Sequence, residues 1–437
     1  MRKDDRMADW SNAHWEGQPD AASRVGRRGG PYRTYTPDSL TRRPLVLPPD
    51  VDALAARTEA SVRQLVDHPG SRGLEGLSRF LLRSEAIASS RIEGLEVSPQ
   101  QVGIAELLAA EGLHRKASAT ARRVAANITA VQRAATSVAG MDAIDLAAID
   151  DVQRTLLEGE PTMHGVRTTQ NWIGGNGYNP VGADFVPPAP HLVPDLMSDL
   201  VAYLNGGTHA PLVQAGIAHA QFETIHPFPD GNGRVGRAVI HAVLVRRGLT
   251  RTAVLPISQV LFTRSQEYVA ALTAYRYDGA PDSAEASGGV AQWLRTFLTA
   301  TGIAVQQAAT FAAELDDLRQ DWSAALAASR TSKDLRPQPR AGSATARLLL
   351  GLQETPVLTT RTVIENYGAS APAAKDALDE LTDAGVLTRR KYDQKTNFYL
   401  AMDVFELITN AERQLASTQW DTAQQRPSRA TPHRVRT

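Results

Sequence analysis

The segment from His226 to Arg237 (His-Pro-Phe-Pro-Asp-Gly-Asn-Gly-Arg-Val-Gly-Arg) brings together groups that could bind phosphate and move a proton. His226 titrates near neutrality and is the predicted general base, which would accept the proton of a hydroxyl group. Asp230 offers hard oxygen ligands that suit Mg²⁺, a cation that usually accompanies a nucleotide's phosphates. The segment therefore predicts a site for a nucleotide and its metal ion.

The second half of this segment supplies groups for the phosphates. Gly231 and Gly233 have no Cβ, so the backbone between them can adopt positive φ and approach a phosphate closely. Asn232 can donate its side-chain amide to the phosphate under attack. Arg234 and Arg237 are three residues apart and project from one side of a first helical turn. The N-terminus of that helix also favours an anion.

Small and apolar side chains recur at helical spacing over 212–225 and again over 234–246. The segment is therefore predicted to be a helix–loop–helix whose loop opens onto a helix N-terminus. Turn chemistry alone would account for an Asn–Gly loop between two core helices. It does not account for a base, a carboxylate, two glycines and two arginines in this order.

A zinc site is another interpretation of the same region. His219, Glu223 and His226 fall at positions i, i+4 and i+7, a spacing that can bind zinc. His226 precedes Pro227, however, where a helix normally stops. Zinc also explains neither the glycines nor the arginines. We therefore expect His219 to be a packed or hydrogen-bonded helical histidine.

The segment resembles the signature of the Fic (Fido-domain) family, His-x-Phe-x-Asp/Glu-Gly-Asn-Gly-Arg-x-x-Arg, and agrees with it at every defined position. Further similarity covers about residues 145 to 300, and a family-like N-terminal region begins near Pro31. The segments that carry this similarity are Gly165-Val-Arg167, Asn171-Trp-Ile-Gly174, Phe185-Val-Pro-Pro188, Leu255-Pro-Ile-Ser258 and Tyr268.

The resemblance implies a protein adenylyltransferase. Such an enzyme transfers AMP from ATP to a Ser, Thr or Tyr hydroxyl of a target protein or of itself, and releases pyrophosphate. His226 would be the base and Asp230 the Mg²⁺ ligand. The turn Gly231-Asn232-Gly233 would hold the α-phosphate, Arg234 and Arg237 the β- and γ-phosphates, and Tyr268 would join the nucleotide-binding residues. The family also suggests a homodimer.

Two alternatives stay open. The same site could use another nucleotide, or remove AMP when a carboxylate positions water. The chain could instead be a DNA-binding regulator whose Fic site senses a nucleotide.

Upstream, Ser89-Ser-Arg-Ile-Glu93-Gly94 lies at the end of a predicted helix that begins near residue 74, and Gly94 would stop that helix. The segment resembles the family's inhibitory motif, Ser/Thr-x-x-x-Glu-Gly/Asn. By this resemblance Glu93 would pair with Arg237 and neutralise the guanidinium that the γ-phosphate needs. Ser89, one turn earlier, could help to hold the carboxylate. By pattern alone, Glu93 could equally be an exposed helix-end glutamate, as Glu96 could.

The run from Ile173 to Pro180 is rich in turn residues, and an extended run from Phe185 to Pro190 follows it. Two such arms predict a β-hairpin flap whose exposed edge could align the backbone of a target protein. An ordinary surface loop is the alternative. His164 and Arg167 are candidates for shaping this region.

Composition narrows the class of protein. The chain has 437 residues, of which 42% are hydrophobic, so it can bury a sizeable core in two or three domains. Lys+Arg and Asp+Glu number 47 each, which gives no global attraction to nucleic acid or membrane. The absence of cysteine excludes disulfides and thiolate metal sites. Without a long apolar run or a signal-peptide pattern, we expect a cytoplasmic protein with no membrane contact.

The predicted fold is mainly α: a Fic helical core with a β-hairpin flap and a small C-terminal winged helix–turn–helix domain. The predicted organisation is a flexible tail (1–30), a helical region with the inhibitory helix (31–140), the catalytic core (141–305), a helix and linker (306–342), the winged helix domain (343–410) and a C-terminal tail (411–437). Among the predicted helices are 290–297 and 303–328, on either side of Gly302.

In the C-terminal domain, three short helices (343–353, 360–365 and 373–384) precede two strands (386–392 and 396–400). The third helix would read DNA in a winged helix, yet it carries Asp376, Asp379, Glu380 and Asp383, which a phosphate backbone would repel. DNA binding is therefore not the favoured role of this domain.

Overall fold

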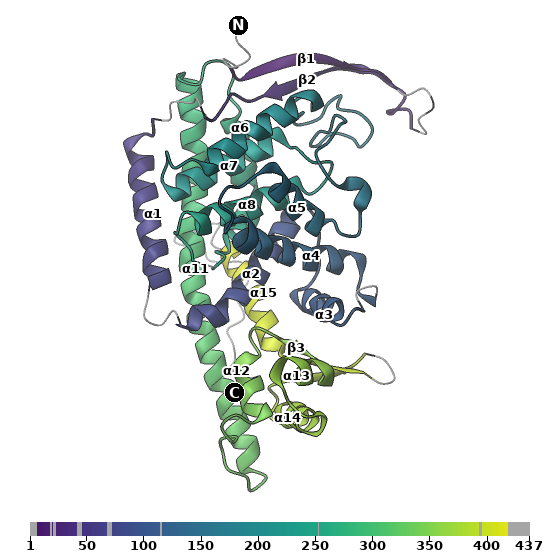
Figure 1. Cartoon of the computed structure of the whole chain (residues 1–437), viewed down its shortest axis with the longest axis vertical. Helices are drawn as coiled ribbons and strands as arrows, with labels where there is room; N and C mark the ends of the chain where they lie inside the picture. Colours follow the sequence, from purple (N-terminus) through teal and green to yellow (C-terminus); the bar gives the residue numbers. More distant parts are fainter. Residues whose placement is uncertain are drawn as a thin grey trace. The chain divides into compact units, whose positions relative to one another are not determined.

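A computed structural model gives the fold of the chain (Figure 1). Among the residues that it describes, no helix combines the length and apolar character that a bilayer span needs. The described residues are 7–17, 20, 23–41, 46–67, 72–113, 116–251, 253–392 and 396–417.

The chain divides into two compact units. Unit 1 comprises residues 1–64, 129–252 and 265–302; unit 2 comprises 65–128, 253–264 and 303–437. Three helices contribute residues to both units: α1 (Pro49–Asp67), α4 (Ala119–Arg133) and α11 (Ala284–Thr331).

Unit 1 is built around a buried helical hairpin, α7 (Pro211–Ile225) and α8 (Asn232–Arg246). Every residue of α7 after the first is buried, so this helix is covered on all sides and not only on the apolar face that the sequence indicated. The other elements of unit 1 are β1 (Asp9–Trp15), β2 (Gly30–Thr36), η3 (Ala134–Val138), α5 (Leu146–Leu156), η4 (Pro161–Met163), η5 (Pro190–Leu192), α6 (Val193–Asn205) and α10 (Ser265–Tyr275).

Polar side chains inside α7 are satisfied by backbone groups of neighbouring elements. Gln214 Nε2 donates to the carbonyl of Tyr203 at 2.8 Å, and Gln221 Nε2 donates to the carbonyl of Asp38 at 2.9 Å. The indole of Trp293 donates to the carbonyl of Gly216 at 2.7 Å. These bonds help to explain how a helix with many polar residues can be buried, because the two glutamine side chains and the Gly216 carbonyl keep partners.

Strands β1 and β2 form an antiparallel hairpin in which Asp9 pairs with Thr36 and Trp15 with Gly30. The predicted flexible tail is therefore wrong for 9–15. Trp10 and Tyr35 are direct cross-strand partners with ring centroids 5.0 Å apart, and such aromatic pairs stabilise a two-stranded ribbon. The charged residues and glycines around 9–15 made the sequence look like a flexible tail, so its aromatic residues were not recognised as part of a strand.

Unit 2 packs α2 (Arg72–Ile92) against α9 (Ile257–Thr263) and the second part of α11, and every residue of α2 from Phe80 to Ser90 is buried. Phe80 and Phe311 meet edge to face with centroids 4.8 Å apart. Helix α3 (Pro99–Ala110) begins with a capping box in which Ser98 and Gln101 bond each other's backbone. Helix α11 is continuous over 48 residues, so the helices predicted on either side of Gly302 are one, and the predicted core boundary at 305 falls inside it.

The C-terminal part of unit 2 contains the three helices and two strands that the sequence predicted, with one additional short strand. The sheet has the order β3-β5-β4 and is antiparallel. Its elements are α12 (Ala344–Gly351), β3 (Val357–Leu358), α13 (Thr360–Tyr367), α14 (Ala371–Asp383), β4 (Thr388–Lys391), β5 (Asn397–Leu400) and α15 (Met402–Ser417).

The predicted C-terminal tail begins too early. Helix α15 continues to Ser417 because Val404, Ile408 and Ala411 recur at helical spacing and are buried. The remainder of that tail, 418–437, lies outside the described residues.

Candidate active site

The signature segment forms the predicted helix–loop–helix. His226 is the C-terminal cap of α7 and has left-handed backbone angles, with φ 50° and ψ 60°. A residue with a Cβ rarely adopts this conformation, because it is strained by about 1–2 kcal/mol. It turns the chain sharply out of α7 before Pro227, so the imidazole stands at the start of the loop.

The loop reaches α8 through Gly231, the N-terminal cap of that helix, with φ 85°. No side chain among the described residues bonds to the first amides of α8 as a cap. The Gly231 carbonyl accepts from the backbone N–H of Val235 at 2.9 Å, which starts the helix. The loop therefore delivers a helix N-terminus in the form that suits a phosphate.

We expect Gly231→Ala to damage the loop. Its positive φ disfavours alanine, and an added Cβ would lie 2.8 Å from Cδ2 of Leu156. The free energy of unfolding should fall by about 1–3 kcal/mol, measured by chemical denaturation. Gly159→Ala is the matched control, because its Cβ would meet no atom within 4 Å. Equal stability of the two variants would contradict this account of the turn.

Asn232 closes the loop on itself. Its Oδ1 accepts from the backbone N–H of Phe228 at 2.8 Å, and its Nδ2 donates to the carbonyl of the same residue at 2.8 Å. This clamp was not foreseen from the sequence. An amide nitrogen carries two hydrogens, so one remains for a ligand, and the phosphate contact of Asn232 stays a prediction.

Asp230 combines an exposed carboxylate with a fixed position. Its Oδ1 accepts from the backbone N–H of Gly231 at 2.6 Å and lies 3.5 Å from Nη2 of Arg234. The side chain is 43% exposed. One such carboxylate fits Mg²⁺, which is usually held by one or two carboxylates together with substrate phosphates and water. No cluster of three His, Asp or Glu side chains that could hold a metal ion occurs among the described residues, and the role of Asp230 as a Mg²⁺ ligand stays a prediction.

Arg234 and Arg237 lie on the first turns of α8, and both are buried, with 3% and 2% of the residue exposed. Arg237 acts on His219, since burial and then the charge of Arg237 lower the pKa of His219 to about 3. The two arginines are therefore buried within unit 1, which their spacing did not indicate, and their contacts with phosphates stay a prediction.

His219 is the packed, hydrogen-bonded histidine that the sequence predicted. Its Nε2 and the hydroxyl of Tyr268 are 2.8 Å apart, and the two rings stack with centroids 6.0 Å apart. A zinc site on this helix gains no support. Tyr268 is 4% exposed, and its place among the nucleotide-binding residues stays a prediction.

The electrostatic surroundings keep His226 neutral. Burial lowers the pKa of His226 to about 3, and the positive charges of Arg167 and Arg276 act in the same direction. Above that pH the imidazole carries no charge, so a ring nitrogen has a lone pair that can accept a proton. The expected titration near neutrality is therefore wrong, and the lowered pKa makes His226 a weaker base than an exposed histidine.

The flap is less regular than predicted. Instead of two extended arms, Ile173 and Phe185 form a single antiparallel bridge. Asn176 organises the turn between them, since its Oδ1 accepts from the backbone N–H groups of Tyr178 and Asn179. Tyr178 is 54% exposed. The glycines in this segment favour turns, which side chains such as Asn176 hold by hydrogen bonds, over a longer run of paired strand residues.

The N-terminal hairpin supports the flap, which no local pattern indicated. The rings of Trp15 and Trp172 meet edge to face with centroids 5.6 Å apart. Asn179 Nδ2 donates to the carbonyl of Val25 at 2.9 Å. The sequence contains Trp15 and Trp172, but nothing in it indicates that these two residues pack against each other.

Arg276 is a site residue that sequence reasoning missed. Its guanidinium lies 3.5 Å from the ring centroid of Phe185, the flap residue that pairs with Ile173. Burial lowers its pKa to about 10, and Glu223 acts in the opposite direction. A lone arginine after a helix carries no pattern that would have identified this position.

The residues of the predicted inhibitory motif belong to unit 2, and the signature belongs to unit 1. Helix α2 ends at Ile92, and Gly94 has φ 75°, so Gly94 stops the helix as predicted. Ser89 is fully buried, whereas Glu93 is exposed. The pairing of Glu93 with Arg237 stays a prediction.

Comparison with known proteins supports the resemblance of the signature segment to the Fic family. Residues 143–244 match the Fic/DOC family. A probable protein adenylyltransferase of Aquifex aeolicus (strain VF5) is 42% identical over 92 residues, which are 21% of this chain and 26% of the relative. The protein adenylyltransferase fic-1 of Caenorhabditis elegans is 33% identical over 132 residues, 28% of this chain and 23% of the relative.

A crystal structure of a Fic family protein from Desulfovibrio desulfuricans G20 aligns with a TM-score of 0.48 and 19% identity, over 82% of this chain and 98% of that chain. The chain spans about a quarter of the length of the curated relatives described above.

Proposed function

Because this chain carries a Fic/DOC domain over residues 143–244, we propose that it is a protein adenylyltransferase that transfers AMP from ATP to a hydroxyl of a target protein. One observation carries the proposal. A neutral imidazole, an exposed carboxylate and an uncapped helix N-terminus follow one another in a single short loop. Transfer of a phosphoryl-type group needs mainly positioning and charge stabilisation, and this loop supplies both.

In this mechanism the imidazole of His226 takes the proton of the target's hydroxyl. The hydroxyl oxygen forms a bond to the α-phosphorus of ATP, and the bond from that phosphorus to the bridging oxygen of the β-phosphate breaks. Pyrophosphate leaves with the electron pair of that bond. The first amides of α8 would hold the α-phosphate, and Arg234 and Arg237 would bind the β- and γ-phosphates.

Asp230 would hold Mg²⁺, which neutralises phosphate charge when it is bound. The carboxylate is fixed by the backbone N–H of Gly231, so its free oxygen can turn toward the metal ion without moving the loop.

The flap would dock the target protein. Ile173 and Tyr178 expose 37% and 54% of their surface on this segment, and an extended target backbone could pair at its edge. Removing residues 175–182 should therefore lower transfer to a separate acceptor chain at least about tenfold while ATP binding is kept. Label transfer to a tagged His226→Asn copy of this chain measures the effect. Undiminished transfer to that copy would refute a docking role.

We also propose that Glu93 restrains the reaction. Helix α2 is held firmly within unit 2: Arg83 Nε donates to Glu106 at 2.7 Å, and Glu85 accepts from the backbone N–H of Ser258 at 2.7 Å. A carboxylate at the end of such a fixed helix can act as a constant electrostatic brake on an arginine that binds phosphate.

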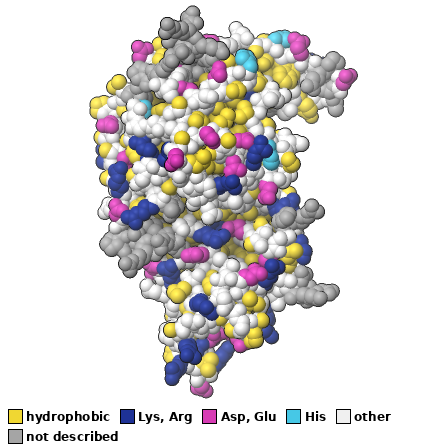
Figure 2. Space-filling view, in the orientation of Figure 1, with side chains coloured by type: hydrophobic (Ala, Val, Ile, Leu, Met, Phe, Trp, Pro, Cys, Tyr) yellow, Lys and Arg dark blue, Asp and Glu magenta, His cyan; other side chains and the backbone are white. Residues whose placement is uncertain are grey.

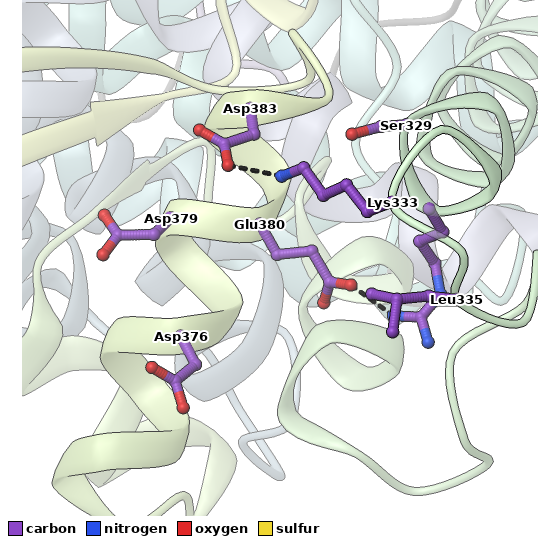
Figure 3. A pocket seen from close by; sticks show the side chains of 8 residues that line it. Ser329, Lys333, Leu335, Asp376, Asp379, Glu380 and Asp383 are labelled. Carbon is purple, nitrogen blue, oxygen red and sulfur yellow. Dashed lines mark hydrogen bonds and ion pairs between the residues drawn. The ribbon is translucent and has the colours of Figure 1, made fainter.

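DNA binding by the C-terminal domain is not favoured. Figure 3 shows that Glu380 and Asp383 of α14 point toward the end of α11, whereas Asp376 and Asp379 point away from it. These four residues help to line a hollow of about 330 Å³. There Arg330 pairs with Glu380, and Lys333 Nζ lies 2.6 Å from Asp383. Glu380 and Asp383 of α14 are thus engaged by cations of the same chain. Lys and Arg are also interspersed with Asp and Glu over the face seen in Figure 2.

Incubation with ATP labelled at the α-phosphate tests the reaction class, with ATP labelled at the γ-phosphate as the control. We expect protein-bound label only from the α-position, because pyrophosphate leaves. Label from the γ-position would indicate a kinase-type transfer. Parallel reactions with the other nucleoside triphosphates identify the base, which no residue described here selects.

A further inference from the structure

Arg167 lies just before the flap, and its guanidinium is buried, with 3% of the residue exposed. Every hydrogen bond that it makes within the described part of the chain goes to a backbone carbonyl. The acceptors are His226 (from Nε, 2.8 Å), Pro188 (from Nη2, 2.6 Å), Ile225 (from Nη2, 3.4 Å) and Thr169 (from Nη1, 3.3 Å).

These carbonyls belong to two places. Ile225 and His226 end α7, where the last carbonyls have no partner inside the helix. Thr169 and Pro188 stand on either side of the flap. In addition, the backbone N–H of Arg167 donates to the carbonyl of Pro227 at 2.8 Å. The side chain of Arg167 therefore connects the strained backbone turn at His226 to the residues on both sides of the flap.

The imidazole itself has little else to orient it. Its Nδ1 is buried and makes no hydrogen bond within the described residues. In many sites a carboxylate or carbonyl on this nitrogen fixes the ring. Here the point from which the side chain starts is fixed by the backbone of His226, whose carbonyl accepts from Nε of Arg167 at 2.8 Å and, at 3.5 Å, from Nδ2 of Asn171.

The positive charge of Arg167 affects the protonation of His226. Neutral donors would satisfy carbonyls at a smaller desolvation penalty, and no carboxylate among the described residues bonds this guanidinium. Burial lowers the pKa of Arg167 to about 10, so it stays charged at neutral pH. That charge disfavours protonation of the imidazole beside it.

We infer that Arg167 is a positioning residue that fixes the backbone of His226, places a positive charge beside its imidazole and couples this base to the flap. The inference rests on the proposed function, in which His226 is the base. The other charged groups around His226 are Arg276, which acts in the same direction, Glu223 on α7, which acts on Arg276, and Asp230 in the loop.

The test compares Arg167→Met, which removes charge and donors, with Arg167→Lys, which keeps the charge but cannot reach four carbonyls at once. In Arg167→Met we expect kcat to fall about 100-fold with KM for ATP changed less than about threefold. In Arg167→Lys we expect a loss of about tenfold. Arg154→Met is the matched control, since Arg154 is 52% exposed in its pair with Asp150.

A second readout does not depend on catalysis. The pKa of His226 is measured by NMR titration of its imidazole, assigned with the His226→Asn variant. It should rise by at least about one unit in Arg167→Met and stay low in Arg167→Lys. Parental kcat in both variants, or an unmoved titration in Arg167→Met, would overturn the inference.

A merely structural role predicts a different pattern, in which both variants lose thermal stability and activity together and the titration does not move. If Arg167→Met fails to fold, Arg167→Lys decides alone: reduced kcat at parental thermal stability with a low pKa supports the inference, whereas full kcat, or a loss of kcat together with thermal stability, overturns it. If the parent itself transfers no AMP, the proposed function fails, whereas the titration still tests the coupling between Arg167 and His226.

Discussion

Replacing His226 by asparagine is expected to lower AMP transfer by about 100- to 10,000-fold, the usual contribution of a general base. ATP binding should be unchanged, because the predicted phosphate ligands are in the loop and on α8. Asparagine is the sharper choice than alanine, since His226 is left-handed and asparagine tolerates that conformation. His226→Ala should show the same loss with some added instability.

Rates from initial label transfer, together with ATP affinity by calorimetry, measure this prediction. His191→Ala serves as control, because His191 is an exposed histidine of unit 1. Since the pKa of His226 is lowered to about 3, its protonation should not limit the parent's rate between about pH 5 and 8. Turnover retained in His226→Asn would exclude this residue as the base.

Removing the carboxylate of Glu93 is expected to act in the opposite direction. In Glu93→Gly we expect self-modification to rise at least about tenfold, which corresponds to about 1.4 kcal/mol of lost inhibition. The substitution should leave the fold intact, because Glu93 is exposed and follows the last residue of α2. The structure of unit 2 is held by deeper contacts such as Arg83 with Glu106.

Glu96→Gly is the matched control for this experiment, because it removes an exposed carboxylate three residues further along. It should leave self-modification at the parental rate. A rise of equal size in both variants would mean that general charge near this helix end matters, and no change in Glu93→Gly would remove the brake from the account.

The sequence was sufficient to predict the helices, strands and turns that depend on residues close together in the chain. The two helices of the signature follow from apolar spacing, and the turn between them follows from Gly231 and the residues around it. Gly94 ends α2 because a glycine can adopt positive φ at that point. The short helices and strands of the C-terminal domain are flanked by cap and turn residues, so their order was also predictable.

Other features depend on partners far apart in the chain. Strand β1 exists because Trp10 meets Tyr35, and the flap is supported because Trp172 meets Trp15. Arg167 contacts the carbonyl of His226, 59 residues further along. Such pairs are decided by the folded packing and not by spacing. The clamp between Asn232 and Phe228 is local, but the types and spacing of the residues in the loop did not indicate it.

The most direct test of the central claim is the intact mass of the Glu93→Gly protein after incubation with ATP and Mg²⁺, beside the Glu93→Gly, His226→Asn double variant. We predict that the single variant gains the mass of one or more AMP groups and that the double variant gains none. An unchanged mass in the single variant, or an equal gain in both, would contradict the assignment of His226 as the base of an AMP-transferring site.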